Sequence, residues 1–316
     1  MNAYVYALVN QKGGIGKTTA AIHLGVGLQR RGFKTLIIDM DAQCNLTFSL
    51  GGDYQHKPTI MDAILGKVDV FDTIQHLDEV DVIPGSSNLS TLENKLDPEG
   101  REFFLADTIA PLKDDYDFII IDSPPALSLI TVGIMCASDS IIIPVGMDMY
   151  SFQGTGQLHR TYSAVKQFCN GTLTIEGILV TQNTVSLKKT LKQIADKMDV
   201  EIFKTSISNS VIVKHAVINQ QSLYKYSPNS KPAKEFSDFV DELLDKRRSR
   251  WNDVSNDEPW YLDAFDSIIT KHEESIAESL EDSLNEIGII LKEPVSKKNE
   301  KDPYDVMDRS LRKERK

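Results

Sequence analysis

The sequence predicts an α/β protein with a doubly wound, mostly parallel sheet that has helices on both faces, followed by a C-terminal helical extension. Two observations lead to this prediction. Short apolar runs typical of buried parallel strands alternate with stretches of helical periodicity along residues 1–248. A glycine-rich segment at residues 10–19 lies between the first apolar run and the first helical stretch, and a phosphate-binding loop occupies that position in a sheet of this kind.

The elements follow in order. The first strand is short and apolar, the helix after the loop has Leu24 and Leu28 four residues apart, and Pro124 and Pro125 end a strongly apolar strand because proline cannot donate to the ladder. Strands are expected at residues 4–9, 34–39, 79–84, 116–122, 140–145, 175–181 and 201–203. Helices are expected at residues 20–29, 58–65, 101–113, 154–168, 187–197, 211–219 and 231–246.

Composition sets wide limits on the function. A chain of 316 residues can form one large α/β core and an appendage. No apolar run approaches the roughly 18–20 residues of a membrane span, and the first nine residues are expected to form a strand instead of a cleavable signal. Three widely spaced cysteines indicate neither a disulfide framework nor a zinc site, and they predict reduced core residues of a cytoplasmic protein.

The charge is unevenly distributed. A net charge of −11 argues against a nucleic-acid binder. Residues 251–316, however, hold 10 lysines and arginines against 17 aspartates and glutamates, a net charge of −7. Much of the acidity therefore belongs to the C-terminal region, and nucleic-acid binding by the first 250 residues remains open.

The glycine-rich segment reads Asn-Gln-Lys-Gly-Gly-Ile-Gly-Lys-Thr-Thr. It departs from the general pattern G-x-x-x-x-G-K-[ST] at its first position, where the chain has Gln11. Backbone N–H groups of such a loop surround phosphates, Lys17 is placed to reach the β- and γ-phosphates, and the Thr18 hydroxyl is placed to bind Mg²⁺. The nucleotide-binding residues are predicted to be Lys12, Gly13, Gly14, Ile15, Gly16, Lys17, Thr18 and Thr19.

Carboxylates end two of the expected strands. Asp122 follows four apolar residues and precedes Ser-Pro-Pro, which fits a Walker B aspartate that holds Mg²⁺. Asp39 and Asp41 lie at the end of the strand at residues 34–39. A carboxylate just beyond a strand end near the phosphate loop can orient the water that attacks the γ-phosphate.

These three segments together resemble the ParA/MinD group of ATPases, whose deviant Walker A motif is K-G-G-x-G-K-[ST]. The segment Asp-Ser-Pro-Pro looks like the Asp-x-Pro-Pro of ParA-type (Soj-like) chromosome and plasmid partition ATPases, and Asp-Met-Asp-Ala-Gln-Cys-Asn resembles their Asp-x-Asp-Pro-Gln-x-Asn. The resemblance implies a P-loop NTPase fold and hydrolysis of ATP to ADP and phosphate with Mg²⁺. Ala42 replaces the proline of the family.

The resemblance also implies residue roles. The catalytic residues would be Lys12, Lys17 and Asp41: Lys12 would cross to the nucleotide of the other subunit in an ATP-dependent sandwich homodimer, and Asp41 would orient water. Thr18 and Asp122 would hold Mg²⁺, with Asp39 as a structural and magnesium-network partner. Asn183 is either an adenine contact or a surface-loop residue.

Residues 205–236 fit the part of the ParA pattern that contacts DNA phosphates without reading sequence. The family has a basic residue where this chain has Asn209, so a DNA-binding surface would depend on Lys214, Lys225, Lys231 and Lys234. The alternative is that these lysines form an ordinary solvated surface.

The domain organisation predicted from the sequence has four parts. Residues 1–248 form the ATPase domain and residues 249–263 a polar linker. Residues 264–291 carry one apolar stripe beside an acidic face, which predicts an amphipathic acidic helix. Residues 292–316 have mixed charge and prolines, which predicts disorder.

The predicted function is ATP-dependent DNA partitioning in the cytoplasm, associated with the nucleoid. The ATP-bound dimer would bind DNA nonspecifically, and a ParB-like centromere-binding protein would stimulate hydrolysis. The alternative is a MinD-like ATPase that positions other proteins at a membrane or cell structure, although such a protein would carry a basic C-terminal helix. A nitrogenase-type reductase would need paired cysteines, and Cys136 has no obvious mate; a bacterial tyrosine kinase would need a tyrosine cluster near Tyr304.

Overall fold

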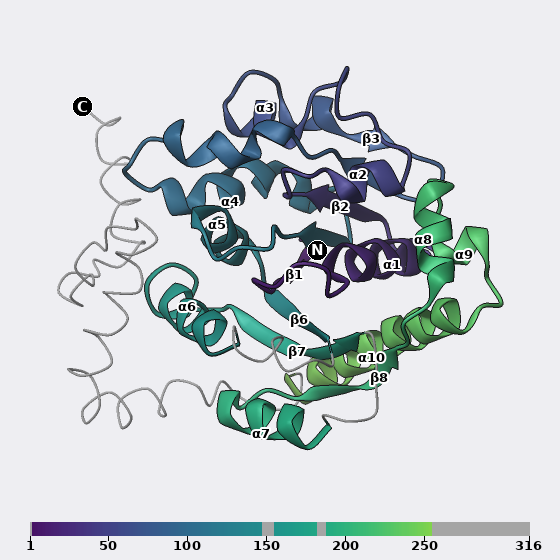
Figure 1. Ribbon diagram of the computed structural model, residues 1–316. Helices are drawn as coiled ribbons and strands as arrows, with labels where there is room; N and C mark the ends of the chain where they lie inside the picture. The colour runs from purple at the N-terminus through teal and green to yellow at the C-terminus, as the bar shows by residue number, and fades with distance from the viewer. Residues whose placement is uncertain (1, 147–154, 182–187, 255–316) are drawn as a thin grey trace, which may run out of the picture.

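The computed structural model describes residues 2–146, 155–181 and 188–254 (Figure 1). In this part of the chain an eight-stranded sheet has the order β3-β4-β2-β5-β1-β6-β7-β8. Neighbouring strands are parallel except β3 and β4, which confirms the predicted doubly wound, mostly parallel sheet. The strands are β1 (Tyr4–Leu8), β2 (Thr35–Asp39), β3 (Gln75–His76), β4 (Asp81–Ile83), β5 (Phe118–Asp122), β6 (Ser140–Gly146), β7 (Thr174–Thr181) and β8 (Ile202–Ile207).

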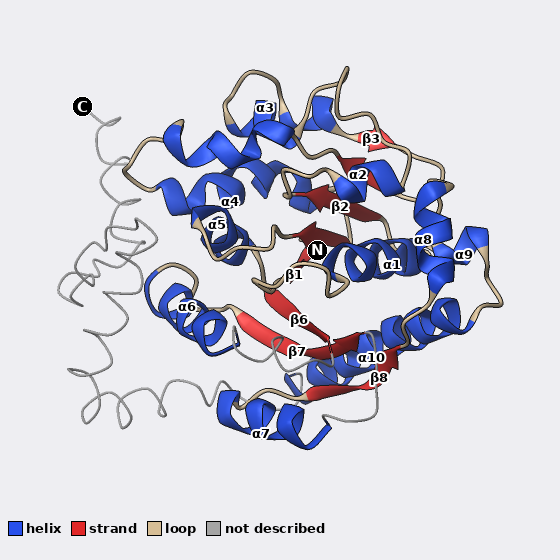
Figure 2. Cartoon of the chain, in the orientation of Figure 1, coloured by secondary structure: helices blue, strands red, loops and turns tan. Residues whose placement is uncertain are grey.

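Helices cover both faces of the sheet, as Figure 2 shows. One face is covered by α1 (Lys17–Gln29), α2 (Asn45–Ser49), α8 (Val211–Ile218), α9 (Leu223–Tyr226) and α10 (Lys231–Val254). The other is covered by α3 (Ile60–Ile64), α4 (Phe104–Ile109), α5 (Leu129–Ala137), α6 (Thr155–Phe168) and α7 (Lys188–Met198).

Side-chain alternation along the central strands separates the two halves of the core. In β5, Phe118 and Ile120 pack with the helices of the α1 side, whereas Ile119 and Ile121 pack with those of the α5 side. All four are buried because a parallel strand between two helical layers has no solvent face. Among the described residues, no helix combines the length and the apolar character that a membrane crossing requires.

Several elements differ from the sequence prediction. The helix expected at residues 101–113 is divided into a 3₁₀ turn at Arg101–Phe103, the short helix α4 and a second 3₁₀ turn at Ala110–Asp114. Pro111 stands at the start of this last turn, and it has no N–H with which to continue an α-helix. β3, α2 and α9 were not expected from the sequence, and β8 and α10 extend beyond their expected ends.

Two predicted features lie outside the described residues. These are Asn183 and the segments beyond Val254, namely most of the linker at 249–263, the helix at 264–291 and the tail at 292–316. Helix α10 continues past residue 248 into the predicted linker as far as Val254. The three cysteines are free, with Cys44 buried and Cys136 and Cys169 partly buried.

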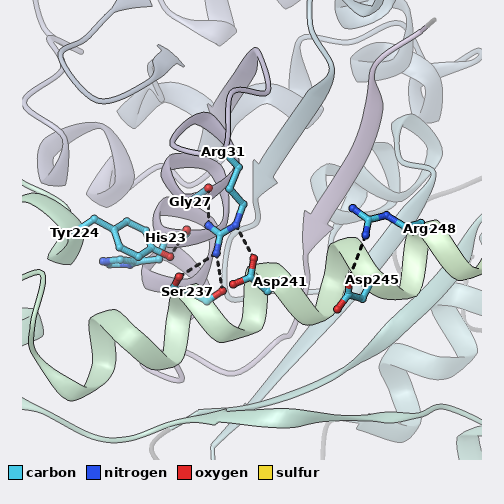
Figure 3. A network of polar contacts seen from close by, with 8 residues as sticks. All are labelled: His23, Gly27, Arg31, Tyr224, Ser237, Asp241, Asp245 and Arg248. Carbon is cyan, nitrogen blue, oxygen red and sulfur yellow. Dashed lines mark hydrogen bonds and ion pairs between the residues drawn. The ribbon is translucent and has the colours of Figure 1, made fainter.

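Helix α1 lies between the sheet and α10, and two glycines permit this close packing. A Cβ on Gly25 would meet Ile37 of β2 at 2.4 Å, and a Cβ on Gly27 would meet Val240 of α10 at 2.8 Å. Arg31, just beyond α1, donates to the Asp241 carboxylate at 2.7 Å and to the Gly27 carbonyl at 2.8 Å (Figure 3). The helix that begins in the phosphate loop is therefore held on both sides.

His23 is the polar centre of this packing. Its ring stacks on Phe236 of α10 with centroids 4.4 Å apart, and the Tyr224 hydroxyl donates to its carbonyl at 3.1 Å (Figure 3). Nδ1 donates to the Thr19 carbonyl at 2.6 Å, and Nε2 accepts from the Leu223 N–H at 2.9 Å. These partners require the neutral ring, and complete burial lowers the pKa of His23 to about 4.

This burial predicts a pH-dependent stability. Between its unfolded pKa near 6.5 and its folded pKa of about 4, His23 takes up a proton more readily in the unfolded chain, so stability falls as pH is lowered through this window. Moving from pH 7 to pH 5 should reduce the free energy of unfolding through this residue by about 2 kcal/mol. The measurement is urea denaturation at both pH values, for the wild type and for His23→Asn.

His23→Asn should be less stable at pH 7 but should lose less stability on acidification. The matched control is His56→Asn, because the His56 side chain is 80% exposed. This control should retain the loss of stability on acidification that burial of His23 causes. Equal pH dependence in the wild type and in His23→Asn would contradict the neutral, buried state assigned to His23.

Candidate nucleotide-binding site

The glycine-rich loop connects β1 to α1 at the carboxyl edge of the sheet. Gly14 and Gly16 have φ angles of 72° and 88°, a left-handed conformation that glycine adopts without strain. Asn10 is buried, donates to the Pro144 carbonyl at 2.8 Å and accepts from the Lys12 N–H at 3.1 Å. The loop is therefore connected to the end of β6.

A second contact holds the loop to β7. The Thr181 hydroxyl, at the end of that strand, donates to the Ile15 carbonyl at 2.5 Å. The Ser123 hydroxyl connects the ends of β5 and β1 by donating to the Leu8 carbonyl at 2.7 Å. The roles of Asn10, Ser123 and Thr181 could not be predicted from the sequence, because each donates to a residue more than 100 positions away along the chain.

Lys17 opens α1 and is largely buried. Its Nζ donates to the Lys12 carbonyl at 2.9 Å, so its ammonium group is held against the loop. Burial lowers the pKa of Lys17, while the carboxylates of Asp122 and Asp41 act in the opposite direction. Two of the three aspartates predicted from the sequence to serve the site therefore lie near enough to Lys17 to affect its pKa.

Asp122 is fully buried at the end of β5, opposite Asp39 of β2 in the sheet register. Its two carboxylate oxygens have no hydrogen-bond partner among the described residues. Burial raises the pKa of Asp122 well above its ordinary value, the Asp39 carboxylate adds to this effect, and the nearby Thr18 side chain and Lys17 oppose it. A buried carboxylate with so few donors around it fits a divalent cation. Asp122 and Thr18 are therefore suited to hold Mg²⁺.

Asp39 has a different set of contacts. One carboxylate oxygen accepts from the Asp41 N–H at 3.2 Å, and the other accepts from the N–H and the hydroxyl of Thr47 at 2.9 and 2.7 Å. Burial raises the pKa of Asp39 to about 6, and these hydrogen bonds oppose the shift. Its structural role is thus evident, and its part in a magnesium network stays a prediction.

Asp41 stands at the rim of the site and is 9% exposed. Its carboxylate accepts from the Gln43 N–H at 3.0 Å, and its carbonyl accepts from the Cys44 N–H at 2.9 Å. This tight turn, in which Cys44 has a φ of 52°, presents the Asp41 carboxylate toward Lys17. The arrangement suits a group that orients water near a phosphate.

A pocket of about 620 Å³ lies over the loop, within the roughly 300–1,000 Å³ range of small-molecule sites. One wall is the phosphate loop, another is the Asp41 turn with α2, and a third is the segment from β8 into α8. The predicted residues that line it are Gly13, Gly14, Gly16, Lys17, Thr18, Thr19, Asp41 and Lys214. Ile15 is buried beneath the loop. These residues, far apart in the sequence, are thus brought together around one pocket.

The lysines predicted to contact DNA lie on α8, α9 and the start of α10, which are neighbours at one end of the molecule (Figure 1). Their surroundings differ. Lys225 pairs with Asp78 at 2.6 Å, and Lys231 pairs with Glu235 at 3.6 Å with its side chain 77% exposed. Lys214 and Lys234 are exposed. The structure therefore groups the four lysines and places a carboxylate beside two of them, Lys225 and Lys231.

Comparisons with known proteins agree with this geometry. A protein-family model for an AAA domain matches residues 3–175. The chain is 33% identical over 246 residues to the sporulation initiation inhibitor protein Soj of Bacillus subtilis, covering 76% of this chain and 97% of that protein. It is 30% identical over 256 residues to the chromosome partitioning protein ParA of Caulobacter vibrioides, covering 78% of this chain and 96% of that protein.

A solved structure is similar along the same region. It is the cobyrinic acid a,c-diamide synthase of Mycobacterium smegmatis with a bound ATP analogue and magnesium, with a TM-score of 0.69 and 30% identity over 78% of this chain and 96% of that one. The fold, the phosphate loop and these relatives lead to one conclusion. The chain belongs to the ParA-type, Soj-like partition ATPases, whose phosphate-binding loop is of the deviant Walker A type.

Proposed function

We propose that this protein hydrolyses ATP to ADP and phosphate with Mg²⁺ in order to partition DNA. The observation that carries the hydrolytic part is the juxtaposition of Lys17, Asp41 and the unpartnered Asp122 carboxylate at one edge of the sheet. A similar solved structure contains an ATP analogue and magnesium, which supports the choice of ligands.

Each residue has a role in this proposal. Lys17 leaves the Lys12 carbonyl to contact the β- and γ-phosphates, while the loop N–H groups from Gly13 to Thr19 bind the remaining phosphate oxygens. Thr18 and Asp122 hold Mg²⁺, which when bound would neutralise phosphate charge. Asp41 orients the attacking water.

The partition function requires further steps. Two ATP-bound copies would form a sandwich homodimer in which Lys12 contacts the nucleotide of the other copy, and Asn183 would contact adenine. The dimer would bind DNA through Lys214, Lys225, Lys231 and Lys234, since lysine contacts to phosphates carry no sequence information. A ParB-like centromere-binding protein would stimulate hydrolysis and release the DNA. The protein would act in the cytoplasm, associated with the nucleoid, and residues 1–248 would form the ATPase domain.

Two substitutions separate nucleotide binding from hydrolysis. Lys17→Ala should abolish binding of a fluorescent ATP analogue because it removes the cation that contacts the phosphates. Asp41→Ala should retain binding and lower kcat by roughly 10²–10⁴-fold, because only the orientation of water is lost. Binding is measured by fluorescence titration and turnover by phosphate release.

Asp107→Ala is the matched control, since Asp107 is exposed on α4 on the opposite face of the sheet. It should leave both binding and turnover unchanged. Undiminished turnover in Asp41→Ala would contradict the assignment of Asp41 as the residue that orients water.

Charge reversal tests the DNA contacts. With ATP and Mg²⁺, the protein should bind duplexes of unrelated sequence with similar affinity. Lys231→Glu should weaken binding to all of them and lower the log–log salt slope by about one for each phosphate that the variant no longer neutralises. Lys225→Glu should have a smaller effect, because Asp78 lies 2.6 Å from the Lys225 ammonium whereas Glu235 lies 3.6 Å from that of Lys231. Fluorescence anisotropy at several salt concentrations measures these effects.

Lys95→Glu is the control for charge alone, because Lys95 is exposed and follows a turn that packs on the opposite face. It should retain nearly all DNA affinity. Failure of the ATP-bound wild type to bind DNA at low salt would refute the DNA-binding part of the proposal and favour a MinD-like role in positioning other proteins.

A further inference from the structure

The Asp39 carboxylate fastens both ends of the segment that carries Asp41. At one end it accepts the N–H of Asp41, and at the other it accepts the N–H and the hydroxyl of Thr47. The intervening residues form a turn with internal hydrogen bonds of its own. The place of the Asp41 carboxylate relative to Lys17 therefore depends on how firmly these two ends are held.

Thr47 extends this fastening to a third part of the chain. Its hydroxyl donates to Asp39 and accepts from the N–H of Gly85, in the loop after β4, at 3.0 Å. The side chain has no exposed surface. The Thr47 hydroxyl therefore acts as a hydrogen-bond donor and as an acceptor at the same time. An apolar side chain at this position would remove the hydroxyl partner of the buried Gly85 N–H and of one Asp39 oxygen.

Gly85 leaves no room for a side chain at this contact. A Cβ at position 85 would lie 3.0 Å from the Asp39 carboxyl carbon and 3.1 Å from the Asp41 carbonyl oxygen. The loop after β4 thus lies directly against the backbone that presents Asp41, and a side chain there would push on it. Thr47 thus contacts the Asp39 carboxylate, and Gly85 lies against both aspartates from a different element.

We propose that Thr47 is a positioning residue for hydrolysis. Its hydroxyl connects Asp39 to Gly85 and thereby holds the Asp41 carboxylate where water must be oriented, without contacting the nucleotide. This inference rests on the proposed ATPase function. Thr47 could not be identified from the sequence, because no motif distinguishes it from any other threonine in a short helix.

The test compares Thr47→Val with Thr47→Ser. Valine keeps the shape and removes the hydroxyl, so kcat should fall at least tenfold while the affinity for a fluorescent ATP analogue changes by no more than about threefold. Serine restores the hydroxyl and should recover most of kcat. Gly85→Ala should lower kcat in the same way and serves as a second variant if Thr47→Val folds poorly.

A buried threonine away from the site provides the matched control. Thr73 is 1% exposed, and its hydroxyl donates to the Val70 carbonyl at 2.6 Å. Thr73→Val should lower stability in urea denaturation and leave kcat unchanged. A purely structural role for Thr47 would give the same pattern, with stability reduced and kcat retained, and that result would overturn the proposal.

A readout without nucleotide keeps this test separate from the proposed function. Amide hydrogen exchange in the nucleotide-free protein should become roughly five- to tenfold faster at Asp41, Thr47 and Gly85 in Thr47→Val, with β1 and α1 unchanged. Unchanged exchange at these amides would refute the positioning role even if the protein hydrolyses ATP. If exchange becomes faster in Thr47→Val but the wild type has no ATPase activity, the role of Thr47 in holding this segment would stand and the proposed function would be refuted.

Discussion

Two carboxylates buried side by side at the ends of adjacent strands are the electrostatic constraint on which this site depends. Asp39 and Asp122 are partners in the sheet register, and neither has exposed surface. Burial of an ionised group is costly unless donors or cations compensate it. The fold compensates the two residues differently: N–H and hydroxyl donors surround Asp39, whereas Asp122 faces Lys17. The Asp39 carboxylate thereby has three hydrogen-bond donors, and the Asp122 carboxylate is the better placed of the two to take a metal ion.

Hydrogen bonds between segments hold the backbone around these two carboxylates. Asn10, Ser123 and Thr181 each donate a side-chain hydrogen bond to the backbone of another segment at the carboxyl edge. His23 of α1 connects this edge to α9 and α10. Its ring is hydrogen-bonded to the Thr19 carbonyl and to the N–H of Leu223 at the start of α9, and it stacks on Phe236 of α10. A phosphate loop held in this way needs little reorganisation when it binds its ligand, which is the condition for effective electrostatic stabilisation.

The sequence was sufficient for the parts of the structure that follow from local patterns. The apolar runs predicted β1, β2, β5, β6 and β7, and the glycine-rich loop was placed correctly between β1 and α1 because a strand, a turn and a helix in succession are each encoded nearby. Edge elements were harder. Strand β3 has only two residues and pairs antiparallel with β4. The part of β8 beyond residue 203, which was not predicted, is held by Glu242 of α10, whose carboxylate accepts the N–H groups of Lys204 and Thr205 at 2.7 and 2.9 Å.

The site divides along the same line. Lys17, Asp41 and Asp122 could be proposed as site residues from the sequence, because each lies at or just beyond the end of a strand or at the start of a helix, in a pattern with a chemical reason. Thr47 and Gly85 could not, because their importance arises from a contact across 38 positions of the chain. Sequence spacing cannot show such a contact. In a single sequence, a threonine that makes hydrogen bonds between two loops cannot be distinguished from one that makes none.

Helix α8 is where the two halves of the proposed function meet. Val213 and Val217 line the nucleotide pocket, and Lys214 of the same short helix is exposed beside it. The N-cap residue Ser210, whose hydroxyl accepts from the Ile212 N–H, also lines the pocket. Because α8 forms both a wall of the pocket and part of the lysine-bearing surface, a change in the occupant of the pocket would alter the position of this helix and of Lys214. Under the proposed function, coupling of nucleotide to DNA would require no long route through the core, because α8 lines the pocket and carries one of the lysines proposed to contact DNA.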